Sequence, residues 1–211
     1  MDVERCRWGD ACMEYVSLIQ SMMPDLRRAL PLDLYDHCVR TMETAVDIAR
    51  SAGADESACA VAGLLHDYCR HFPGTRLLKL AAELGIVFGD VERHRPLLLH
   101  GPVASELVSR DLGVTDHRIL DAIRYHTTGR AGMCAVEQVV YVADKVEPGK
   151  FPTLRLSLEG PGRGADGEEP LKRFLVEHAN DTILRLVKAG AAIHPLVVEM
   201  RNWIIQARVE I

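Results

Sequence analysis

A histidine and an aspartate stand side by side at His66-Asp67, directly after an apolar segment that runs from Cys59 to Leu65. An ionised carboxylate beside a buried segment is costly unless an opposite charge lies close to it. A metal ion supplies that charge, and the chain holds further imidazole and carboxylate groups of the same kind. We therefore predict a metal site whose ligands are His37, His66, Asp67, His100, His126 and Asp144.

This mixture of nitrogen and oxygen ligands suits Fe, Mn, Zn or Co better than Ca or Mg. Six ligands exceed the four of a tetrahedral ion, so the set could hold two ions with Asp67 between them. Each residue alone also has an ordinary structural explanation. A lone histidine on an apolar helix is more often a core residue, and Asp144 could pair with Lys145 or Arg124. The order of all six, with His66 adjacent to Asp67, favours the metal.

The bulk properties of the chain narrow the class of protein. Its 211 residues are enough for one sizeable core or two small ones. A net charge of −5 disfavours a general nucleic-acid binder, because no basic excess is present to neutralise phosphates. No apolar run reaches the roughly 18 residues of a membrane helix, and the first residues lack the layout of a signal peptide. We expect a cytoplasmic protein with free cysteines and without nucleic-acid or membrane partners.

Apolar residues recur at helical spacing along most of the chain, and alternating β-branched runs are nearly absent. We predict a single all-α domain over residues 1–211, with its metal-binding core at 30–148. The stretch 159–167 has four glycines and no large apolar residue, and is interpreted as a flexible loop before the C-terminal helices at 170–208. Helices are expected at 10–22, 32–52, from 55 or 57 to 65, and at 75–84, 101–111, 116–126, 134–146, 170–189 and 195–208.

Several helix boundaries carry specific signals. Pro24 is expected to end the first helix, because proline lacks the N–H that a helix interior needs. Gly53 suits the left-handed residue that follows a helix, while Asp55 or Ser57, and Asp116, suit N-caps. Most of the predicted ligands fall at or near such boundaries. Helix ends converge readily on a shared cleft, so these ligands can meet although they are distant in sequence.

The pattern His37, His66-Asp67 and Asp144 resembles the signature of the HD-domain metal-dependent phosphohydrolases. More narrowly, the chain resembles the YqeK family, bacterial hydrolases that split diadenosine tetraphosphate symmetrically. The resemblance runs from about residue 37 to residue 148 and is fainter near 180–182 and 193–195. It rests on the stretches Ala62–Tyr68, Leu99–Val103, Ala122–Arg130, Gly132-Met133, Tyr141–Asp144 and Glu147-Pro148.

The chain departs from the family pattern near the expected phosphate contacts. Leu34 stands where the family usually has an arginine, and Arg70 where it usually has a lysine. Gly149 and Lys150 replace an Asn-Arg pair, and the stretch 159–167 is an insertion. All six predicted ligands are retained. The resemblance therefore still implies a metal site, while the substrate preference is open.

The resemblance implies an enzyme that hydrolyses phosphoanhydride bonds with one or two divalent ions, iron before Mn, Co or Zn. His66, Asp67 and Asp144 are then the catalytic residues, since the metal that they hold lowers the pKa of water. Cationic side chains and N–H groups would hold the nucleotide or dinucleoside polyphosphate. The residues predicted for this role are Arg70, Thr127, Gly129, Arg130 and Lys145.

Other functions are compatible with the same residues. One is a nucleotidase or (d)NTP phosphohydrolase of the wider HD group, and another is a nucleotide-binding regulatory module without activity. A plain helical interaction protein would require the six residues to be coincidental. The apolar helix at 195–208, which carries Trp203 and Ile204, either packs internally or pairs with a second chain, so a homodimer is a further prediction.

Overall fold

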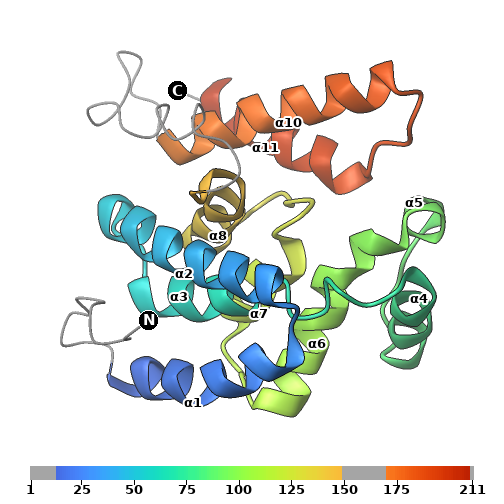
Figure 1. Cartoon of the computed structure of the whole chain (residues 1–211). Coiled ribbons are helices and arrows are strands. Elements are labelled where there is room, and N and C mark those ends of the chain that lie inside the picture. Colours follow the sequence, from blue (N-terminus) through green and yellow to red (C-terminus); the bar gives the residue numbers. More distant parts are fainter. Residues whose placement is uncertain (1–12, 149–169, 210–211) are drawn as a thin grey trace.

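A computed structural model describes residues 13–148 and 170–209 of the chain. These residues form helices joined by short turns and loops, with no β-strand among them (Figure 1), so the expected all-α class is confirmed. In chain order the helices are α1 (Met13–Ala29), α2 (Leu32–Ala52), α3 (Glu56–Leu65), α4 (Gly74–Glu83), α5 (Asp90–His94), the 3-10 turn η3 (Pro96–Leu99), α6 (His100–Leu112), α7 (His117–Tyr125), α8 (Ala135–Val146), α10 (Pro170–Lys188) and α11 (Pro195–Val209).

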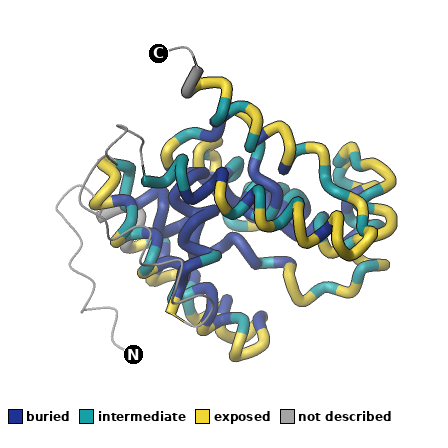
Figure 2. The backbone as a smooth tube through the Cα atoms, turned by 90° about the horizontal axis from the view of Figure 1, so that it is seen from above, coloured by how far each residue is buried: buried dark blue, intermediate teal, exposed yellow. Residues whose placement is uncertain are grey.

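The centre of the fold is α3, in which all residues from Ser57 to Leu65 are buried. Helices α2, α7 and α8 pack around it, and the buried backbone concentrates there (Figure 2). A helix that is apolar on all sides belongs in the interior, as the run 59–65 predicted. The residue at the end of this helix is His66, so the central packing also fixes one end of the predicted metal site.

The helix boundaries around the core agree with the sequence signals. Gly53 follows α2 with φ +67°, and its N–H donates to the carbonyl of Ala49. Asp55 is the N-cap of α3, because its carboxylate accepts from the N–H groups of Ser57 and Ala58. Asp116 caps α7 in the same way. These caps satisfy N–H groups that have no partner within the helix.

The expected end of the first helix before Pro24 is wrong, because α1 continues to Ala29. A proline inside a helix costs about 3 kcal/mol. The stripe of Ile19, Met22 and Leu26 is buried, as is Leu30 after the helix, so two large apolar residues beyond the proline enter the core. Their burial, about 1.5–3 kcal/mol each, offsets the cost of the proline.

Two short elements had no counterpart in the sequence prediction. Helix α5 spans five residues and η3 spans four, and together they lead from α4 into α6. Such short segments show no measurable periodicity, so a sequence pattern does not reveal them. They matter to the site because they form one wall of the pocket described below.

The C-terminal helices α10 and α11 form a hairpin that covers α8 (Figure 1). A second buried cluster lies between them, with Phe174, Met200 and Ile204 each at most 1% exposed. Ile204 and its neighbour Trp203 therefore pack within the chain, which is the internal alternative considered for this helix. No described helix is both long and apolar enough to cross a membrane. The predicted loop 159–167 lies outside the described residues.

Candidate metal centre and active site

One group of donor atoms brings together four of the predicted ligands, all buried. The Nε2 atom of His37 lies 3.1 Å from that of His66 and 3.5 Å from Oδ2 of Asp67. Oδ1 of Asp144 lies 3.3 Å from His37 and 3.6 Å from His66. Ligand atoms around one ion with bonds of 2.0–2.1 Å lie about 2.9–3.4 Å apart. The four donor atoms are close to that spacing.

A second group shares Asp67 and adds the remaining two histidines. Oδ1 of Asp67 lies 3.0 Å from Nε2 of His100 and 3.4 Å from Nε2 of His126. The two imidazole nitrogens are 2.9 Å apart. Asp67 therefore turns one oxygen to each group, as a carboxylate between two ions would. Two-metal hydrolytic sites place their ions about 3.5–4 Å apart.

Hydrogen bonds on the far side of each imidazole fix which nitrogen is free for a ligand. Nδ1 of His66 donates to the carbonyl of Gly63 and Nδ1 of His126 to that of Ile123, both at 2.7 Å. Nδ1 of His100 donates to the carbonyl of Leu97. A carbonyl only accepts, so each Nδ1 carries the proton and each Nε2 presents a lone pair to the site.

The Nε2 atoms of the histidines are oriented so that a cation fits between them. Two lone pairs face each other across 2.9 Å at His100 and His126, and such a pair cannot form a hydrogen bond. A positive ion held by these nitrogens and the nearby carboxylates would relieve that repulsion. The donor set, its spacing and its protonation therefore all fit divalent ions, and the predicted ligands are the residues that would hold them.

Glycines let the ligand-bearing helices approach one another. A Cβ on Gly63 of α3 would lie 3.0 Å from the Cα of Met42 in α2, so the close crossing of these helices requires glycine. A Cβ on Gly101 would lie 2.8 Å from the carbonyl oxygen of Arg124, at the end of α7. This second contact brings the start of α6, which is His100, against His126.

Neighbouring side chains control the pKa of the two carboxylates in the site. Burial alone would raise the pKa of Asp67, but His66, His100 and His126 around it lower that pKa well below its usual value. Burial would also raise the pKa of Asp144. The ammonium of Lys145 is the largest of the influences that instead hold this pKa well below its usual value. Both carboxylates are therefore ionised at neutral pH, as metal ligands must be.

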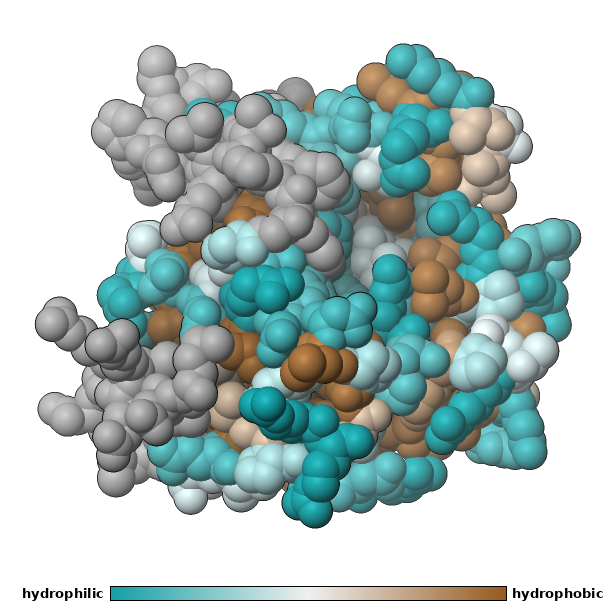
Figure 3. All heavy atoms as spheres, viewed as in Figure 1, coloured by the Kyte–Doolittle hydropathy of each residue, from teal (hydrophilic) through white to brown (hydrophobic). Residues whose placement is uncertain are grey.

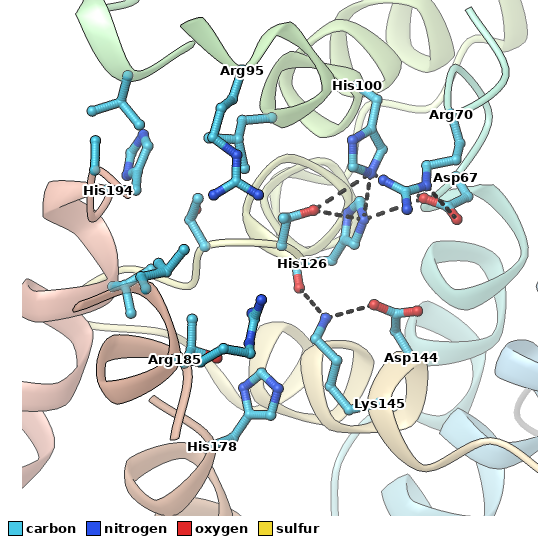
Figure 4. A pocket seen from close by; sticks show the side chains of 18 residues that line it. Asp67, Arg70, Arg95, His100, His126, Asp144, Lys145, His178, Arg185 and His194 are labelled. Atoms are coloured by element: carbon cyan, nitrogen blue, oxygen red, sulfur yellow. Dashed lines mark hydrogen bonds and ion pairs between the residues drawn. The ribbon is translucent and has the colours of Figure 1, made fainter. Parts of the chain in front are cut away.

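A pocket of about 320 Å³ opens beside these ligands. It lies between the α10–α11 hairpin and the side of the molecule that carries α5 and α6, where the surface is hollowed (Figure 3). Asp67, His100, His126 and Asp144 line its inner end, and His178, His194 and two arginines line the part farther out (Figure 4). The predicted metal ligands thus lie at the inner end of a cavity large enough for a nucleotide-sized ligand.

Three of the residues predicted to contact phosphate line this pocket. The Nε atom of Arg70 lies 3.9 Å from Oδ2 of Asp67, and its side chain is 42% exposed. The hydroxyl of Thr127 lies 3.0 Å from Nε2 of His126. Lys145 donates to Oδ2 of Asp144 at 2.5 Å and to the carbonyl of His126 at 3.0 Å (Figure 4).

The other two predicted phosphate contacts do not line the pocket. Arg130 donates to Glu137 and Asp121, and its guanidinium stacks over the ring of Tyr125. The N–H of Gly129 donates to the carbonyl of Tyr125 at 2.7 Å. Nε and Nη2 of Arg130 and the N–H of Gly129 are thus already engaged, so this geometry does not favour their predicted contact with phosphate.

Sequence reasoning missed several residues of the site. Glu147 accepts from Nδ1 of His37 at 3.2 Å and from Nε of Arg40 at 2.6 Å, so it orients an expected metal ligand. Arg95, His178 and Arg185 line the pocket from α5, α10 and their surroundings. No motif marks these three. The faint similarity near residues 180–182 and 193–195 points only to the C-terminal helices, which carry His178 and Arg185.

Comparisons with known proteins agree with this geometry. The model of the HD domain family matches residues 34–149. The symmetrical bis(5′-nucleosyl)-tetraphosphatase of Bacillus subtilis is 35% identical, over 81% of this chain and 89% of its own. The protein of that name from Staphylococcus aureus is 29% identical, over 84% of this chain and 89% of its own.

A solved structure has the same fold. The crystal structure of an HD superfamily hydrolase involved in NAD metabolism from Clostridium acetobutylicum superposes with a TM-score of 0.80 at 29% identity. The match covers 89% of this chain and 97% of that one. The family match, the relatives and the arrangement of six ligands lead to one assignment: the chain belongs to the HD domain family, and within it to the group of the symmetrical bis(5′-nucleosyl)-tetraphosphatases.

Proposed function

We propose that this chain is a metal-dependent phosphohydrolase that splits diadenosine tetraphosphate and related dinucleoside polyphosphates into nucleoside diphosphates. The observation that carries the proposal is the carboxylate of Asp67, which faces one donor group with each oxygen at the inner end of the pocket. The relatives from Bacillus subtilis and Staphylococcus aureus are named for the same reaction. In it, water adds across the central P–O–P anhydride, and both halves leave as diphosphates.

Bound metal ions would act as a Lewis acid toward the phosphoryl oxygens and would lower the pKa of a bound water. The protein's own residues hold the ions and orient the substrate. His37, His66, Asp67, His100, His126 and Asp144 fix the position of the ions, and Glu147 fixes His37. Thr127 and Arg70 provide donors to the phosphate that undergoes attack, and Lys145 holds Asp144 ionised.

The finer assignments of the cofactor belong to the same proposal. We take the occupant to be two ions, because the donors form two groups that share one carboxylate. Iron is the proposed metal, with Mn, Co and Zn as substitutes, because imidazole and carboxylate accept all four. A single domain over residues 1–211, a cytoplasmic location and a homodimer are further parts of the proposal that stay predictions.

The test is a product analysis with metal quantification. Protein purified without oxidation is analysed for bound metals, and its products from diadenosine tetraphosphate are separated by chromatography. About two equivalents of iron or a similar ion, with ADP as the sole product, would support the proposal. Equal amounts of ATP and AMP would contradict the symmetrical reaction. Turnover of mononucleotides alone would favour the nucleotidase alternative, and bound metal without any turnover would favour a regulatory module.

A further inference from the structure

Two arginines at the outer end of the pocket have no carboxylate partner in the described part of the chain, unlike other arginines near the site. Arg95 and Arg185 line the cavity, yet neither guanidinium has a hydrogen bond or an ion pair with another described residue. Arg40 and Arg130, by contrast, are paired with buried glutamates. Both residues are exposed, so water solvates their guanidiniums when no ligand is bound. What points to a ligand is their position: they line the cavity that holds the predicted metal ligands, with no carboxylate from residues 13–148 or 170–209 beside them, so both are available to an anion bound there.

The two side chains extend into the pocket from opposite walls (Figure 4). Arg95 lies between α5 and η3, and Arg185 lies in the last turn of α10. The two walls are joined by a hydrogen bond from Nε2 of His194 to Oε1 of Glu92 in α5, 3.1 Å long. This bond holds both cations over the same space, away from the ligands at the inner end.

A neutral donor lies beside the arginines. His178 of α10 lines the same pocket, and the hydroxyl of Tyr141 lies 3.0 Å from its Nδ1. The buried phenol has no other hydrogen-bond acceptor among the described residues, so it donates to Nδ1, and the proton of the imidazole is on Nε2. The outer end thus offers two forked cations and one N–H, a combination suited to phosphate oxygens rather than to a base or a sugar.

We propose that Arg95 and Arg185 form a clamp for the diphosphate of the leaving nucleoside half. The proposal rests on the proposed function, because a tetraphosphate reaches from the metal-ligating end to a second anionic group. When the central anhydride breaks, the electron pair of the P–O bond stays on the leaving diphosphate. Two guanidiniums neutralise the charge that develops there, and they select a substrate with a second diphosphate beyond the cleaved bond.

The first experiment measures binding without turnover. Inorganic tripolyphosphate is titrated by calorimetry into wild type, Arg95→Ala, Arg185→Ala and the double variant. Each single substitution should raise Kd at least about tenfold, and the double variant about a hundredfold. Arg185→Lys, which keeps the charge but loses the fork, should lie between wild type and Arg185→Ala. A double variant that binds tripolyphosphate as wild type does would overturn the clamp.

The matched control is Arg93→Ala. Arg93 lies two residues before Arg95, is 60% exposed on its side chain, and stacks over Phe88 away from the pocket. The Arg93→Ala variant removes the same charge from the same wall. If the loss of affinity in Arg95→Ala is local rather than due to net charge, the Kd of Arg93→Ala for tripolyphosphate should stay within about twofold of wild type. An equal loss in Arg93→Ala and Arg95→Ala would also overturn the clamp.

The second experiment separates the clamp from the proposed function. With bis(4-nitrophenyl) phosphate, which has no second diphosphate, the double variant should keep its kcat/KM while losing about a hundredfold with diadenosine tetraphosphate. Equal losses with both substrates would refute the clamp and leave the function standing. A wild type that releases no ADP, yet binds tripolyphosphate through both arginines, would refute the proposed function while supporting a polyphosphate clamp.

Discussion

Nδ1 of His37 donates to Oε1 of Glu147 at 3.2 Å, although the two residues are 110 positions apart in the chain. The other oxygen of the glutamate accepts from Arg40 at 2.6 Å, and its side chain is 2% exposed. The bond directs the opposite nitrogen of the imidazole toward Asp67 and Asp144. A carboxylate behind a histidine ligand fixes its orientation and raises its basicity.

Glu147→Gln should therefore weaken metal binding by about 10- to 100-fold, while far-UV circular dichroism stays unchanged. The amide keeps the shape but loses the charge that orients His37. Metal affinity is measured by competition with a chelating dye. Glu106→Gln, which alters the ion pair with Arg124 away from the site, serves as the control. Unchanged affinity in Glu147→Gln would show that the histidine needs no such support.

Asp67→Asn should abolish hydrolysis and lower the metal content by at least one equivalent, because one carboxylate serves both donor groups. An amide offers one oxygen instead of two, and no charge. Elemental analysis and product chromatography are made on the same preparation. Asp121→Asn, which affects only the surroundings of Arg130, should retain both properties. Full metal content with normal turnover would remove Asp67 from its assigned role.

Gly101→Ala should cost about 1–3 kcal/mol of the free energy of unfolding and a larger fraction of activity. Its Cβ would lie 2.8 Å from the carbonyl oxygen of Arg124, so α6 must move away from α7 and carry His100 away from His126. Denaturant unfolding and steady-state rates check both effects. Gly89→Ala, where the nearest atom is a flexible Glu92 oxygen at 3.5 Å, should leave both nearly unchanged. Equal behaviour of the two variants would argue against the close contact.

The hydrogen bond between Glu92 and His194 predicts a dependence of stability on pH. Burial raises the pKa of Glu92, but the hydrogen bond from His194 and others from backbone N–H groups lower it more. A lowered folded-state pKa gives stability that is present above the unfolded pKa of about 4.3 and is lost as pH falls through the folded pKa. Wild type should thus melt above Glu92→Gln at pH 7, with the difference narrowing below about pH 4.5. A constant difference down to pH 3 would contradict this.

The central helices, and the grouping of the predicted ligands at their ends, could be predicted because their signals are local. The run before His66 is apolar on all sides, Gly53 and Asp55 mark adjoining boundaries, and the pair at 66–67 is conspicuous beside a buried segment. Asp67 was expected to stand between two ions from the number of ligands alone. The structure adds the geometry by which each oxygen turns to a different group.

The phosphate-binding side chains were harder to predict because packing decides which cations have an anionic partner. Arg130 follows the histidine loop in sequence, but the fold places it against Glu137 and Asp121. Arg95 and Arg185 lie in segments with no signal of their own and reach the pocket only through tertiary contacts. Pro24 failed as a helix end for the same reason: burial of residues beyond it outweighed a local preference.

The six ligands come from α2, α6, the ends of α3 and α7, and α8, and so span the chain from residue 37 to residue 144. Ions held by them would join these distant segments as cross-links do. Closing loops of this size removes conformational freedom from the unfolded chain. The same ions that serve the reaction would then tether the helices of the core, so protease resistance should follow metal loading even in a variant that cannot turn over substrate.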